Sequence, residues 1–136
     1  MTISRTDSSL LFRVLLANAL FSGISGLILL FAAGAVSRLI GFENPQLLMA
    51  LGAGLLVFSF LLARHVRRQR IGRTEAIAIS IMDLGWVLAS AGLLLLYPDL
   101  FSPAGVVAII AVAVIVLVFF ELQALALWKT RQKPTT

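Results

Sequence analysis

Four long apolar segments dominate the chain, and a short polar stretch separates each from the next. Between Val14 and Val36 the sequence has no charged residue over 23 positions. A helix needs about 20 apolar residues to cross a hydrocarbon core about 30 Å thick. A cleaved signal peptide is the alternative for the first segment, but its apolar region would usually be about 7–15 residues. We therefore predict spanning helices over about 12–34, 45–64, 74–97 and 103–128.

Residues that start or stop helices lie at the ends of these segments. Asn44 and Ser102 each stand before a proline, and a capping side chain followed by proline is a common helix start. Thr74 can cap the third helix, and Pro98 prevents that helix from continuing. Residues 36–42 are too few and too mixed to span, so we expect them to lie at the membrane interface.

These elements predict an all-α integral membrane protein, a bundle of four transmembrane helices in up-down-up-down order, forming one domain over residues 1–136. Residues 25–31 resemble residues 91–97, and each stretch is followed by a short loop and a second helix. Two tandem helical hairpins would produce this repeat. Chance similarity between leucine-rich helices would also produce it, and both interpretations remain open.

Composition supports a membrane environment. The chain is 60% hydrophobic and 12% charged, whereas a soluble domain has about 25% charged residues. The net charge of +5 clusters beside apolar spans, which is typical of membrane topology and requires no nucleic acid partner. The sequence has no Cys, which excludes disulfides and thiolate metal sites. We predict the lipid bilayer as a partner, and no metal or cofactor.

The basic residues predict an orientation. Ten of the 11 lie in the N-terminal leader, in residues 64–73 or in the basic tail over 129–136. By the positive-inside rule, both termini face the cytoplasm, and we expect a multi-pass protein of the plasma (cell inner) membrane. The arginines of the 64–73 segment are also candidates for contact with anionic lipid headgroups: Arg64, Arg67, Arg68, Arg70 and Arg73.

Polar side chains within the spans are the candidates for function. A carboxylate near the bilayer centre costs about 2.5–3.5 kcal/mol, so Asp83 and Glu121 each require an explanation. Both lie in the predicted cytoplasmic half, and we expect both to face inward, whereas Gln123 is 200° away from Glu121 on its helix. The candidate ligand or proton site contains residues from all four helices: Asn18, Ser59, Ser80, Asp83, Trp86 and Glu121.

Three pairs of small residues spaced four apart allow close helix contacts. They are Ser22 with Gly26, Ala50 with Gly54, and Gly85 with Ala89. Packing within one chain is favoured over a homo-oligomer interface, although the same rule applies to both.

The favoured function is a non-enzymatic membrane component or accessory subunit, in which the acids hydrogen-bond helices together. The alternative is a small transporter or a protein that binds a ligand, cation or proton through Asp83 and Glu121. A membrane enzyme acting on a lipid comes third. A homo-oligomer or another membrane protein as partner remains open.

Overall fold

The computed structural model describes residues 1–131, and helices make up most of that range. The part of the predicted basic tail beyond Arg131 lies outside the described residues. The elements follow in the order β1 (Thr2–Ser4), α1 (Ser9–Phe31), α2 (Ala33–Ile40), α3 (Pro45–Arg68), β2 (Arg70–Gly72), α4 (Arg73–Leu96) and α5 (Pro103–Arg131). Four of these helices, α1, α3, α4 and α5, are long and apolar enough to cross a membrane. The prediction of an all-α fold with four long helices is confirmed at this level.

Two predicted helix starts are confirmed by their caps. The Oδ1 atom of Asn44 accepts from the Leu47 backbone N–H at 3.1 Å. The Ser102 hydroxyl accepts from the Gly105 backbone N–H at 3.1 Å. Each bond satisfies one of the backbone donors that a helix leaves free at its start.

Helix α1 lies three residues earlier than predicted and α5 ends three residues later, and three further differences have a local explanation. The helix α3 continues to Arg68, because residues 64–68 contain no Gly or Pro and basic side chains are favourable near a helix C-terminus. The cap of α4 is Gly72 and has no side-chain bond, so the predicted cap at Thr74 is wrong. Much of the predicted interfacial segment is the short helix α2, which ends where Gly41 adopts a left-handed conformation with φ 74°.

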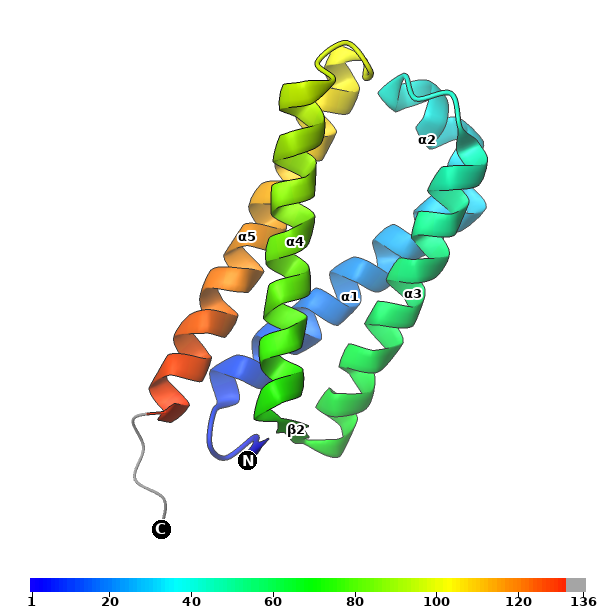
Figure 1. Ribbon diagram of the computed structural model, residues 1–136. Coiled ribbons are helices and arrows are strands. Elements are labelled where there is room, and N and C mark those ends of the chain that lie inside the picture. Colours follow the sequence, from blue (N-terminus) through cyan, green and yellow to red (C-terminus); the bar gives the residue numbers. More distant parts are fainter. Residues whose placement is uncertain (132–136) are drawn as a thin grey trace.

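The long helices pack as two pairs. The most extensive contacts join α1 to α3 and α4 to α5, and α1 also packs on α5. Helices α3 and α4 follow one another in sequence but share at most isolated backbone contacts, and Figure 1 shows them diverging beyond β2. The N-terminus and the end of α5 lie at one end of the bundle, here called the basic end, and α2 lies at the other, the α2 end (Figure 1).

The first pair of helices crosses where two glycines meet. A Cβ atom added at Gly52 would lie 2.7 Å from the carbonyl oxygen of Gly26, and one added at Gly26 would lie 2.8 Å from the carbonyl oxygen of Gly52. The backbones therefore touch at this crossing. Gly26 belongs to the predicted small-residue pair on α1, and it makes the expected close approach, to Gly52 of α3. A Cβ atom added at Gly54 or Gly85, which belong to the other two predicted pairs, would meet nothing within 4 Å.

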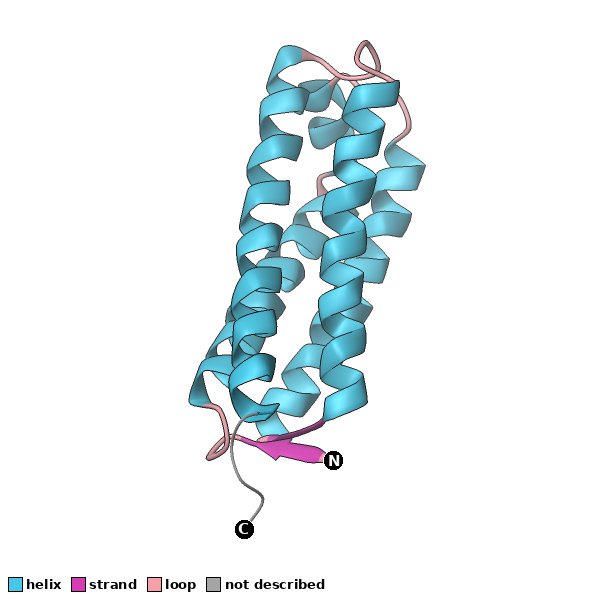
Figure 2. Cartoon of the chain, turned by 60° about the vertical axis from the view of Figure 1, so that its left-hand side comes forward, coloured by secondary structure: helices cyan, strands magenta, loops and turns pink. Residues whose placement is uncertain are grey.

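A two-stranded antiparallel ribbon closes the basic end, a feature that the sequence analysis did not predict. Strands β1 and β2 pair with Ile3 opposite Ile71, and both isoleucines are buried in the core. Figure 2 shows the ribbon lying across the ends of the helices. The ribbon therefore fixes the N-terminal leader against the turn between α3 and α4.

Candidate functional site

Asp83 is the centre of a buried hydrogen-bond network that joins three helices. Its Oδ2 atom accepts from Asn18 Nδ2 on α1 at 2.8 Å and from Gln123 Nε2 on α5 at 2.8 Å. All three side chains are buried. Because α1 and α4 share at most isolated backbone contacts, the Asn18–Asp83 bond is a direct link between the two helix pairs.

Two serines complete this network. The Ser22 hydroxyl donates to Asn18 Oδ1 at 3.1 Å, and the Ser80 hydroxyl donates to Gln123 Oε1 at 2.9 Å. Each amide thus accepts from a serine and donates to the carboxyl group of Asp83. This arrangement gives every one of these buried side chains a hydrogen-bond partner, which avoids the cost of burying an unpaired polar group, and it orients both amides.

The two oxygens of Asp83 have different surroundings. Within the described residues, Oδ1 has no hydrogen-bond partner, whereas Oδ2 has two. The described chain has no fully buried side-chain oxygen or nitrogen that lacks a partner, so Oδ1 is not completely enclosed. Asp83 also lines a cavity. Its Oδ2 atom therefore holds helices together, while Oδ1 keeps its capacity to accept a hydrogen bond.

The cavity has a volume of about 780 Å³ and lies between the two helix pairs. On α4 it extends from Met82 to Leu93, about 16 Å at 1.5 Å per residue. Phe42 and Phe101 line it at the α2 end. Its lining is mainly aliphatic and aromatic, with polar side chains from α1 and α4: Asn18, Ser22, Ser25, Asp83, Trp86 and Ser90.

Four of the six residues predicted for the site come together. Asn18 and Ser80 belong to the Asp83 network, and Trp86 lines the cavity beside Asp83. Ser59 does not join them, because its hydroxyl donates to the backbone oxygen of Ala19 at 2.7 Å. That bond fastens α3 to α1.

The prediction that Glu121 faces inward is wrong. Its side chain is exposed on the outside of α5, and Gln123, with 0% exposure, occupies the interior position. A second inward carboxyl would place like charges together, whereas Gln123 supplies the donor that Asp83 requires. The same rotation of α5 is visible one heptad later. Glu121 is seven residues before Trp128, which is exposed, and Gln123 is seven residues before Thr130, which is buried.

The arginines predicted to contact lipid headgroups divide into two groups. Arg64, Arg67, Arg68 and Arg70 are exposed at the basic end. Arg73 is engaged within the protein, because its guanidinium donates to Thr130 Oγ1 at 3.1 Å and to the backbone oxygen of Leu127 at 3.2 Å. It thereby joins the start of α4 to the end of α5.

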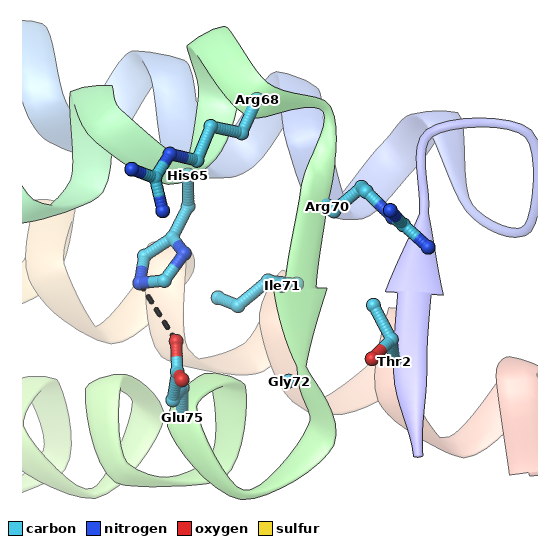
Figure 3. Close-up of a pocket in the computed structure, with 7 residues that line it drawn as sticks. All are labelled: Thr2, His65, Arg68, Arg70, Ile71, Gly72 and Glu75. Carbon is cyan, nitrogen blue, oxygen red and sulfur yellow. Dashed lines mark ion pairs between the residues drawn. The ribbon is translucent and has the colours of Figure 1, made fainter.

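A second pocket, of about 410 Å³, lies at the basic end, where Arg68 and Arg70 form part of its lining. Figure 3 shows it between α3, the ribbon and the start of α4, with Arg70 extending toward β1. His65 Nε2 lies 2.9 Å from Glu75 Oε2 across the pocket (Figure 3). This open pocket carries both signs of charge, and its acid is already paired. In the described chain, no three His, Asp or Glu side chains are grouped as metal ligands.

Comparisons of the chain with protein-family models, with curated proteins and with solved structures find no significant match. The class of the protein therefore follows from its own features. It is a small helical protein with four helices long and apolar enough to cross a membrane, which is compatible with a multi-pass membrane protein.

Proposed function

We propose that the chain is an integral membrane protein that binds a membrane-soluble small molecule in the cavity between its helix pairs. The observation that carries this proposal is Asp83, whose carboxyl group has both of its hydrogen bonds on Oδ2 and which lines a largely apolar cavity. Ionisable groups inside a membrane usually mark a site of function. The volume of about 780 Å³ falls in the range of ligand sites, about 300–1,000 Å³.

The structural role expected for the acids is compatible with this function. Asp83 Oδ2 holds α1, α4 and α5 in register through Asn18 and Gln123. This bonding leaves Oδ1 free to bind a ligand. Asp83 is therefore proposed to serve both roles, and Glu121, which faces outward, is not included in the site.

Two glycines provide a matched test of cavity binding. Gly54 lines the cavity and Gly85 does not, and neither would place a Cβ atom within 4 Å of a neighbour. We expect Gly54→Phe to abolish thermal stabilisation by amphiphiles added to the detergent-solubilised protein. Gly85→Phe should retain it. If both variants respond to every amphiphile as the parent protein does, ligand binding in this cavity is refuted.

We also propose that the basic end faces the cytoplasm of a plasma membrane, in accordance with the charge bias. Thr74 near the basic end and Glu43 near the α2 end are both exposed. A membrane-impermeant maleimide added to intact cells should label Glu43→Cys and leave Thr74→Cys unlabelled until the cells are permeabilised. The reverse pattern would invert the orientation.

An accessory subunit is the second candidate, and an exposed face of α4 favours it. A Cβ atom at Gly85 or at Gly92, one heptad later, would meet nothing within 4 Å. Small residues at such spacing allow the helix of another membrane protein to approach closely. Under this function, Gly85→Phe would release a co-purifying partner protein, while Gly54→Phe would not.

A further inference from the structure

The polar end of the cavity lacks a positive charge. Asp83 is the only charged residue in the lining, and within the described chain no Lys, Arg or His reaches the cavity. The two groups bonded to its carboxyl are neutral amides. A buried acid is stabilised most strongly by an opposite charge that also donates a hydrogen bond. A cationic hydrogen-bond donor is therefore the ligand group that best complements this carboxyl group.

Aromatic residues line the same cavity as Asp83. Trp86 is one helical turn after Asp83 on α4, and Phe21 and Phe58 are also part of the lining. Indole and phenyl faces attract ammonium groups, and the attraction increases when water is excluded. The same rings provide apolar contact for a hydrocarbon body. This combination favours a cation over an anion at the polar end.

Cavity-lining residues on the facing sides of α3 and α4 are exposed. Leu51 on α3 is 38% exposed and Met82 on α4 is 57% exposed, although both line the cavity. Helices α3 and α4 share at most isolated backbone contacts, and they diverge in Figure 1. In a membrane, this side faces lipid. A ligand would therefore enter from the bilayer with its apolar part already in hydrocarbon.

We infer that the ligand is a lipophilic amine, an amphiphile with one protonated amino group and an apolar body. The amine donates to Asp83 Oδ1, and the hydrocarbon extends along α4 toward Phe101. This inference rests on the proposed function and specifies its ligand. An acidic amphiphile would place a like charge beside Asp83, and an alcohol would provide a donor without a charge.

The test compares three probes with the same chain length, tetradecylamine, tetradecanol and tetradecanoate. Each is titrated at pH 7 into the full protein held in phosphatidylcholine nanodiscs, and binding is followed by the shift in thermal unfolding. Asp83→Asn is the test variant, because its amide oxygen can still accept from Asn18 and Gln123. Glu121→Gln is the matched control, because it removes an acid that is exposed on α5.

Tetradecylamine should bind saturably and more tightly than the other two probes. Asp83→Asn should weaken it by about tenfold to 100-fold, the range for losing a hydrogen bond to a charged group. Glu121→Gln should leave it unchanged. Equal binding to Asp83→Asn, or tighter binding of the alcohol or the acid, would overturn the amine inference. If Gly54→Phe blocks those other probes, the cavity remains a ligand site and only the ligand class is wrong.

Should Asp83→Asn fail to fold, the ranking of the three probes on the unaltered protein still decides the question. An amine that binds no better than the alcohol contradicts the inference. An amine preference that Gly54→Phe removes and Gly85→Phe keeps supports it.

Discussion

Replacing Gln123 by Leu is a direct test of which polar residue of α5 faces the interior. Leu has nearly the volume of Gln, so the change removes hydrogen bonds without opening a large cavity. The variant loses the donor to Asp83 at 2.8 Å and the acceptor for Ser80 at 2.9 Å. The matched variant is Glu121→Leu, two positions away on the same helix and exposed.

The magnitude follows from those two bonds. Hydrogen bonds between transmembrane helices contribute about 0.6 kcal/mol on average and about 1.7 at most. Neither partner of Gln123 is left without a hydrogen bond, because Asp83 still accepts from Asn18 and Ser80 still donates to the backbone oxygen of Ala76. We therefore expect Gln123→Leu to lower the free energy of unfolding by about 1–2 kcal/mol. An exposed change such as Glu121→Leu should stay within about 0.5 kcal/mol.

Unfolding by added sodium dodecyl sulfate, followed by circular dichroism, measures both values in the same mixed micelles. Gln123→Leu should unfold at a lower mole fraction of the denaturing detergent than the parent protein. Glu121→Leu should unfold close to the parent value. A loss of stability confined to Glu121→Leu would refute the assignment of Gln123 to the interior.

Three further variants test other contacts. Gly52→Ala forces a methyl group against backbone at the α1–α3 crossing and should lower the free energy of unfolding by about 1–3 kcal/mol. Gly54→Ala should not lower it. Equal free energies of unfolding for the two variants would contradict the crossing. Arg73→Met removes two hydrogen bonds and should lower the thermal unfolding temperature, with an unchanged temperature arguing that α4 and α5 are not joined there. Ile3→Asp places a charge in the buried face of the ribbon and should expose the turn after α3 to trypsin, whereas Thr2→Asp, on the exposed face, should not. Protection of the turn in both variants would contradict the proposal that burial of Ile3 keeps the ribbon closed.

Apolar length and helix caps were sufficient to predict the four long helices. Asn44 and Ser102 acted as caps because a side-chain acceptor followed by proline is local information. The end of α3 was harder to place, because a run of arginines is compatible both with a loop and with a helix C-terminus. Strand β1 could not be predicted, since three residues carry no measurable periodicity and their partner, β2, lies almost 70 positions away.

Only part of the candidate site could be predicted, because some of its residues are identified by the cost of burial and others by the packing of the helices. The cost of burying polar groups identifies Asp83 and Asn18 from sequence alone. Choosing between Glu121 and Gln123 required the rotation of α5 about its axis, which only the structure supplies. The cavity itself depends on which helices fail to pack together, and periodicity within one helix contains no such information. The crossing partner of Gly26 was missed for the same reason.

Ligand binding at Asp83 is tested most directly by Trp86, which lines the cavity. In Trp128→Phe, Trp86 is the only indole, since the chain has two Trp residues. Tetradecylamine brominated in its chain should quench the fluorescence of Trp86 saturably, and Asp83→Asn should move the saturable part to an amine concentration about tenfold to 100-fold higher. Quenching that rises linearly with the concentration of the amine, and equally in both proteins, would show only collisions within the lipid and would contradict a binding site at Asp83.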